Sequence, residues 1–120
     1  MAMQNADQDA DKKAVVNIAN GVITGVTPPG IKMGTKRKQH IEWSIESEDR
    51  NVNYTFPGDG IVIKSDPNGQ FYDGGKVTGD DTKYKWHDNN SDTISYKYTV
   101  NVMNGTTPLK PLDPTIDNGQ

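Results

Sequence analysis

The chain has 120 residues, a formal net charge of −3 and no cysteine, and this length is typical of one domain. The lack of cysteine excludes disulfides, thiolate metal sites and cysteine nucleophiles, and so small a net charge indicates no electrostatic partner. No apolar run approaches the roughly 20 residues that span a bilayer, so we expect no membrane partner.

The apolar residues are mostly β-branched. The chain holds nine Val and nine Ile against two Leu, with eleven Thr in addition. Such side chains are stiff about χ1 and suit a pleated surface. Twelve Gly and seven Pro, spaced at short intervals, indicate many turns between short strands. We therefore expect an all-β fold.

The first residues differ from the rest in composition. Residues 1–13 are polar and acidic and show no period, so we expect a disordered tail before a single domain over residues 14–120. The segment MAMQNADQDADK lacks the apolar core of a secretory signal. Two locations stay open: the cytoplasm, or export with a leader already removed.

The first expected strands cover residues 14–18 and 22–26. Asn20-Gly21 separates them, and this dipeptide readily adopts the positive φ of a tight turn. The two segments form either a hairpin or one interrupted edge strand. Pro28-Pro29 then ends the second segment, because proline cannot donate to a sheet ladder.

Residues 40–46 show the clearest alternation. In HIEWSIE, the apolar residues Ile41, Trp43 and Ile45 alternate with polar ones, a period of two that predicts a strand with one buried face. His40 falls on the outward face. Residues 51–56 alternate in the same way.

Residues 60–75 are predicted to form a hairpin. Its turn is Asp66-Pro67-Asn68-Gly69, in which proline presets φ and glycine accepts a left-handed conformation.

Two more alternating segments follow. Residues 82–87 place Tyr84 and Trp86 on one face and His87 on the other, and residues 93–103 form the longest and most central expected strand. The inward residues expected there are Ile94, Tyr96, Tyr98, Val100 and Val102.

Seven or eight strands at intervals of about ten residues fit a two-layer antiparallel β-sandwich, immunoglobulin-like or cupredoxin-like. We expect Trp43, Trp86 and Tyr96 inside.

The segment Asp92-Thr93-Ile94-Ser95-Tyr96-Lys97-Tyr98 resembles the D-x-A-x-Y-x-C stretch of immunoglobulin-like domains. The resemblance makes Tyr96 the corner tyrosine and places Tyr98 where the second cysteine stands. Together with the terminal segment 113–118, residues 40–118 resemble small bacterial proteins of immunoglobulin-like or cupredoxin-like shape. The resemblance implies a β-sandwich, here without the disulfide.

Metal ligands are present only in weak patterns. A blue-copper site needs a cysteine thiolate beside two histidines and a methionine, and the chain lacks that thiolate. Both histidines, His40 and His87, are expected to face solvent. Asp88, Asn90 and Asp92 match the start of an EF-hand loop, but the glycine and the bidentate glutamate that should follow are missing. We expect no metal and no cofactor, and interpret these residues as turn caps.

Enzymatic and nucleic-acid-binding signatures are also weak. The chain has no G-x-S-x-G elbow, and a glycine-rich segment near Lys76 departs from the phosphate-binding loop. The run Lys36-Arg37-Lys38 is a small basic patch without aromatic residues. Other lysines are expected to face glutamates on a neighbouring strand. We therefore expect neither an enzyme nor a nucleic-acid partner.

Two functions stay open. The first is a non-catalytic interaction or structural module that binds a protein or its own copy through an edge strand or end loops. The second is a ligand-binding module, for carbohydrate or a divalent metal, at the loops 66–73 and 88–92. Tyr72, out of phase with its neighbour Phe71, is the expected exposed contact residue, and the candidate ligand-binding residues are Tyr72, Asp73, Asp88 and Asp92.

Overall fold

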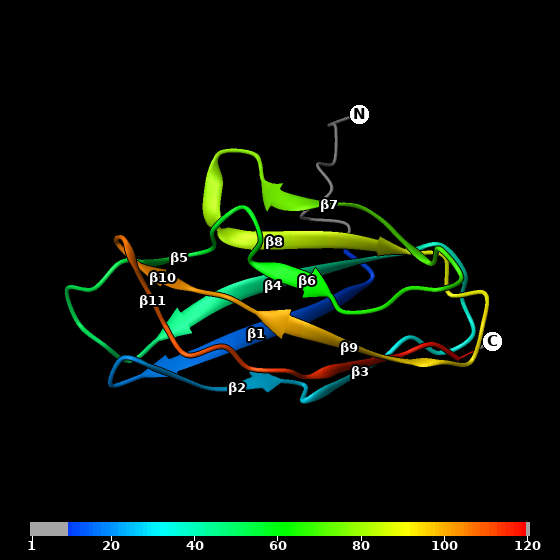
Figure 1. Ribbon diagram of the computed structural model, residues 1–120, viewed down its shortest axis with the longest axis horizontal. Coiled ribbons are helices and arrows are strands. Elements are labelled where there is room, and N and C mark those ends of the chain that lie inside the picture. Colours follow the sequence, from blue (N-terminus) through cyan, green and yellow to red (C-terminus); the bar gives the residue numbers. More distant parts are fainter. Residues whose placement is uncertain (1–9, 120) are drawn as a thin grey trace.

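Strands form the regular structure of the protein. A computed structural model describes residues 10–119, which contain twelve strands and no helix (Figure 1). The predicted all-β fold is confirmed. Several strands span only two or three residues, too few for a visible period, which is why the number exceeds seven or eight. The strands are β1 (Lys12–Ala19), β2 (Val22–Thr27), β3 (Gly30–Lys32), β4 (Gln39–Ser47), β5 (Tyr54–Thr55), β6 (Ile61–Ile63), β7 (Phe71–Val77), β8 (Asp80–Asp88), β9 (Ser95–Val100), β10 (Met103–Asn104), β11 (Thr107–Pro108) and β12 (Thr115–Asp117).

The first sheet has the strand order β2-β1-β4-β8-β7. Asn20 and Gly21, both with positive φ, join β1 to β2 as an antiparallel hairpin, which confirms the turn expected there. β4 pairs with β8 antiparallel but with β1 parallel, so the sheet is mixed rather than purely antiparallel. The parallel pair arises because the chain leaves this sheet after β2 and returns to it as β4.

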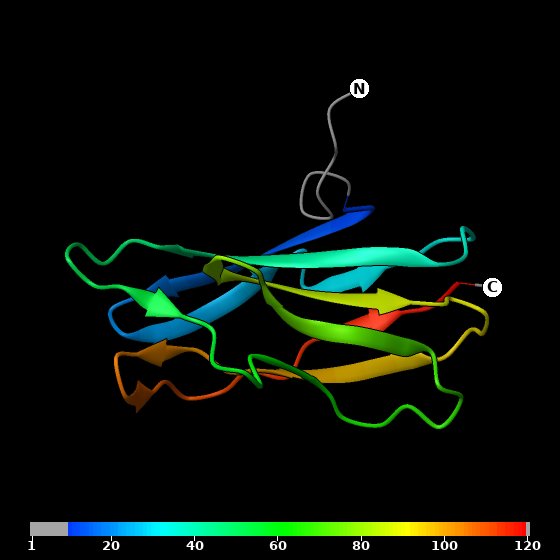
Figure 2. The same ribbon diagram turned by 90° about the horizontal axis from the view of Figure 1, so that it is seen from above.

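The second sheet has the order β3-β12-β9-β6. β12 pairs with β9 antiparallel and with β3 parallel. The chain changes sheet at Pro28-Pro29, between β2 in the first sheet and β3 in the second. β10 pairs with β5 and β11 in a small three-stranded sheet. Seen from above, the two main sheets form two layers (Figure 2).

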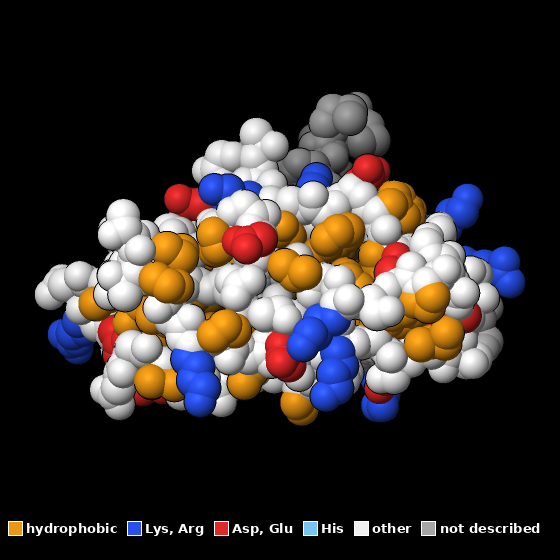
Figure 3. Space-filling view, in the orientation of Figure 1, with side chains coloured by type: hydrophobic (Ala, Val, Ile, Leu, Met, Phe, Trp, Pro, Cys, Tyr) orange, Lys and Arg blue, Asp and Glu red, His pale blue; other side chains and the backbone are white. Residues whose placement is uncertain are grey.

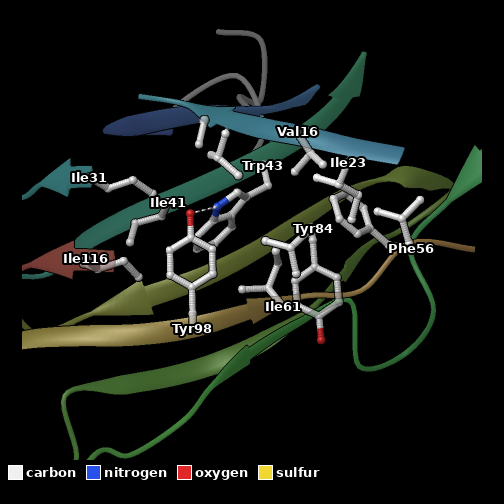
Figure 4. Close-up of a cluster of buried hydrophobic side chains, with 14 of the residues drawn as sticks. Val16, Ile23, Ile31, Ile41, Trp43, Phe56, Ile61, Tyr84, Tyr98 and Ile116 are labelled. Atoms are coloured by element: carbon white, nitrogen blue, oxygen red, sulfur yellow. Dashed lines mark hydrogen bonds between the residues drawn. The ribbon is translucent and has the colours of Figure 1, made fainter. Parts of the chain in front are cut away.

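The core fills the space between the layers. Trp43 of β4 and Tyr98 of β9 are both fully buried, and the Trp43 Nε1 atom donates to the Tyr98 hydroxyl over 3.1 Å (Figure 4). The alternation of β4 thus predicts Trp43 correctly. Burying each large side chain contributes about 1.5–3 kcal/mol. Tyr96 is buried as expected, whereas Trp86 is only partly buried and Ile94 is exposed.

The hairpin expected over residues 60–75 is wrong. β6 pairs with β9 in the second sheet, and β7 pairs with β8 in the first. The turn itself exists, because the Gly69 amide donates to the Asp66 carbonyl and Gly69 has a positive φ. Residues 66–69 therefore form a corner between the sheets. The hairpin lies one strand later, between β7 and β8 around Gly79.

The outer face of β4 is more buried than its alternation predicts. His40 and Glu42 are buried although they lie on the face opposite Trp43. Lys83 of β8 lies 3.9 Å from Glu42, which confirms the expected pairing of lysine and glutamate across these strands. The expectation of a solvent-facing histidine is wrong at His40.

Contrary to our expectation, residues 93–103 do not form the longest strand: β9 spans six residues, whereas β4 and β8 span nine each. The first sheet begins earlier than expected: Lys12 and Lys13 already belong to β1, whereas residues 1–9 of the predicted tail lie outside the described residues. In the described range, no helix is long and apolar enough to cross a membrane.

Candidate functional site

Three of the four predicted site residues lie on strands of the first sheet. Tyr72 of β7 is the register partner of His87 on β8, while Asp88 follows His87 and points to the opposite face. Asp92 lies in the loop after β8. The structure brings Asp88 and Asp92 together and leaves Tyr72 and Asp73 outside that group.

Tyr72 belongs to a row of three stacked rings. Its ring centroid lies 5.2 Å from that of His87, which in turn lies 5.0 Å from that of His40. The register of β7, β8 and β4 places the three residues side by side. Tyr72 is 37% exposed, so its sequence phase correctly predicts an exposed ring.

Asp73 lies where β7 loses its regular register. The pairing with β8 shifts between Tyr72 and Gly75, and Asp73 itself has a positive φ of 53°. Aspartate tolerates this conformation better than most residues. The Asp73 side chain is exposed and makes no hydrogen bond or ion pair within residues 10–119.

Asp88 and Asp92 meet at one end of the sandwich in a group that we call the end cluster: Gln70, Asp88, Asn90, Asp92 and Asn118. The Asn118 amide nitrogen lies 3.2 Å from an oxygen of Asp88, 3.0 Å from one of Asp92 and 3.2 Å from Gln70 Oε1. Asn118 belongs to the C-terminal segment, so the cluster joins residues distant in the sequence.

The two carboxylates of the end cluster differ in electrostatics. Asp88 is fully buried, and burial raises its pKa to about 6. Burial also acts to raise the pKa of Asp92, but hydrogen bonds from Tyr96 and Asn68 outweigh it and hold that pKa below its ordinary value. The Tyr96 hydroxyl donates to the carboxylate of Asp92, four residues upstream.

The end cluster works as a structural anchor. The Asp88 carboxylate accepts from the backbone N–H of Asn90, and the Asp92 carboxylate accepts from the backbone N–H of Ile94. The interpretation as turn caps is therefore confirmed. The side-chain amide nitrogen of Asn90 donates to the backbone carbonyls of Gly34 and Lys36. Across residues 10–119, no group of three histidine, cysteine, aspartate or glutamate side chains is placed to hold a metal ion.

A third place, missed at the sequence level, is a groove between β6 and β7. These are the edge strands of the two sheets on one side of the sandwich, and hydrophobic side chains gather between them on the face shown in Figure 3. The groove has a volume of about 430 Å³, within the range of ligand clefts. It is lined by Gly58, Asp59, Ile61, Val62, Ile63, Asp66, Phe71, Gly74, Tyr84 and Trp86. We call it the β6–β7 groove.

Trp86 joins the two walls of this groove. Its Nε1 atom donates to the Ile61 carbonyl over 2.8 Å, which links β8 of the first sheet to β6 of the second. A Cβ atom at Gly74 would lie 2.3 Å from the Trp86 ring. Only glycine therefore lets the backbone of β7 lie against the indole.

Two carboxylates line the groove, and their surroundings differ. Both oxygens of Asp66 accept backbone amides, from Gln70 and Phe71. Asp59 is exposed, and its carboxylate makes no hydrogen bond or ion pair within the described chain. Together with burial, which has the larger effect, the charge of Asp59 raises the pKa of Tyr84. Within the described residues, Asp59 is thus an exposed carboxylate in the lining of the groove that has no hydrogen-bond partner.

Little in the sequence could have revealed this groove, because its walls come from strands that pair in different sheets. Gly74-Gly75 inside an alternating segment is the signal that was available, since glycine in a strand often marks a close backbone approach. The sequence matches no protein-family model and no curated protein.

Proposed function

We propose that the protein is a non-catalytic binding module that holds an extended segment of a partner protein in the β6–β7 groove. The observation that carries this proposal is an apolar groove flanked by two edge strands, one from each sheet. Edge strands present unpaired backbone groups to other chains. Val62, at the centre of β6, leaves 38% of its surface exposed.

We also propose that the sandwich is of the cupredoxin-like kind. Immunoglobulin-like domains consist of antiparallel sheets, and the parallel β1–β4 pair departs from that arrangement. The proposal concerns shape alone, because the chain has no cysteine to supply a blue-copper thiolate.

The two tryptophans provide an internal test of the binding site. Peptides selected from a phage-displayed library of random nine-residue sequences are titrated into the ¹⁵N-labelled protein. We expect the indole N–H signal of Trp86, which faces the groove, to shift together with the amides of β6. The buried indole of Trp43 is the control and stays unchanged.

A variant separates this site from others. Val62→Lys places a charge on an edge strand, a common natural device against strand addition, at an exposed position where the fold tolerates it. Binding that is lost in this variant supports the proposal. Selected peptides that shift the amides of other strands, and leave the Trp86 signal in place, would contradict it.

A second candidate function uses the exposed ring of Tyr72. The row formed by Tyr72, His87 and His40 fixes an exposed aromatic ring on the outer face of the first sheet, and aromatic rings are typical contacts for sugars. A glycan array tests this alternative: a bound glycan whose signal disappears in Tyr72→Ala, but not in Val62→Lys, would support carbohydrate binding. An array without signal would contradict it.

A further inference from the structure

We infer that the partner segment adds as a strand to β6 and carries a lysine or arginine side chain that reaches Asp59. This inference rests on the proposed function and specifies the chemistry of the partner.

The backbone of β6 shows which groups are open to a new strand. The Gly60 carbonyl accepts from Asn101, and the Lys64 amide donates to Lys97, so residues 60 and 64 face β9. Backbone polar groups alternate between the two sides of a strand. Residues 61 and 63 therefore point away from β9, towards the groove.

One of these outward groups is already occupied. The Ile61 carbonyl accepts from the Trp86 indole, which agrees with the alternation. The amide and the carbonyl of Ile63 remain directed to the open side of the sheet. An extended segment that aligns with β6 meets this donor and acceptor, as in strand addition to a sheet edge.

The chemistry of the lining favours a basic segment. The residues that line the groove include two aspartates and no lysine, arginine or histidine. Asp66 uses both carboxylate oxygens for backbone amides, which leaves Asp59 as the anion that a ligand can pair with. A cationic side chain complements it.

Lysine and arginine also match the apolar part of the groove. Their methylene stems pack along apolar surfaces while the charged end stays at the rim. Here the stem would lie over Trp86, which is only partly buried, and the charged end would meet Asp59 in solvent. An acidic side chain would instead be repelled by Asp59, and a neutral polar one would form no ion pair with it.

The composition of the selected peptides tests the inference. In the library selection, we expect binders at the groove to be enriched in one lysine or arginine flanked by strand-forming residues. In the best peptide, replacing the basic residue by glutamine should weaken binding about two- to fivefold, as for an exposed ion pair. N-methylation of the peptide amides should weaken binding at alternate positions, because one side of an added strand pairs with β6.

A double-mutant cycle assigns the ion pair to one residue. Asp59→Asn should weaken the binding of the basic peptide by the same factor and should leave the affinity of the glutamine-substituted peptide unchanged. Asp73→Asn is the matched control, since it removes an exposed carboxylate that lies outside the lining, and we expect it to leave the affinity unchanged.

The outcomes separate this inference from the proposed function. Peptides that bind at the groove without basic enrichment, and with no effect of Asp59→Asn, would overturn the inference but keep the binding site. If no selected peptide moves the Trp86 signal, the proposed function itself fails. A self-association that Val62→Lys abolishes would show that the occupant is a second copy of this chain and would overturn the assignment to a partner protein.

Discussion

The buried carboxylate of the end cluster makes the stability of the protein depend on pH. Burial raises the pKa of Asp88 from its ordinary value of 3.8 to about 6. Between these two values the folded state holds a proton that the unfolded chain releases. The stabilisation from this group is therefore complete below about pH 4 and is lost as pH rises through about 6.

The magnitude follows from the two pKa values. The rise from 3.8 to about 6 corresponds to roughly 3 kcal/mol at about 1.36 kcal/mol per pKa unit. Asp88→Asn keeps an oxygen that can accept from Asn90 and Asn118 but removes the titrating group. We expect the free energy of unfolding of the variant, relative to wild type, to rise by roughly 2–3 kcal/mol between about pH 4 and pH 7.5.

Urea unfolding at a series of pH values, followed by tryptophan fluorescence, measures this difference. Constant effects of the substitution, such as an altered hydrogen bond to Asn118, cancel when the two ends of the pH range are compared. Asp73→Asn controls for the loss of one negative charge at an exposed site. A difference between Asp88→Asn and wild type that does not change with pH would refute the reasoning.

Three further predictions concern the core, the groove wall and the strand order. Tyr98→Phe should lower the free energy of unfolding by about 1–3 kcal/mol, because it leaves the buried indole N–H of Trp43 without its acceptor; urea unfolding measures this, and an unchanged midpoint would contradict it. Gly74→Ala should shift the NMR signal of the adjacent Trp86 indole N–H, since the new Cβ would overlap the ring; an unmoved signal counts against the described contact. Val62 and Thr99 are register partners, so cysteines at both positions should form a disulfide on mild oxidation, and free thiols in a mass spectrum would contradict the β6–β9 pairing.

Local sequence patterns predicted the positions of the strands better than they predicted which strands pair with one another. The alternation around Trp43 identifies β4 and its core face, because the period of a strand depends on adjacent residues alone. The burial of His40 on the opposite face depends on packing around that face, including the ring of His87 on a neighbouring strand. A polar side chain in an alternating segment therefore does not by itself indicate exposure.

The corner at residues 66–69 shows a second limit. Proline and glycine there predict a chain reversal, and the structure contains one. A turn of this sequence can connect either the two strands of a hairpin or two strands in different sheets, since a turn fixes only a local change of direction. The choice depends on which partners complete each sheet: β9 for the strand before the corner and β8 for the strand after it.

In the candidate sites too, the local features were predictable and the long-range contacts were not. The spacing of Asp88 and Asp92 predicts turn caps, and both carboxylates accept backbone amides as expected. Asn118, which bonds to both, lies 30 and 26 residues later in the sequence, and no local pattern marks it. The β6–β7 groove is harder to predict from the sequence, because it lies between the edge strands of two different sheets.

The segment between β6 and β7 connects the end cluster to the β6–β7 groove. Asp66 holds the amides of Gln70 and Phe71, and these neighbours then diverge, since Gln70 enters the end cluster and Phe71 lines the groove. Asp88 does not line the groove, and Asp88→Asn leaves the contacts of Asp66 in place. We therefore expect this variant to change the pH dependence of unfolding and to bind the selected peptides with wild-type affinity, measured by the same NMR titration. A weakened affinity would show instead that the charge of the end cluster reaches the groove through this segment.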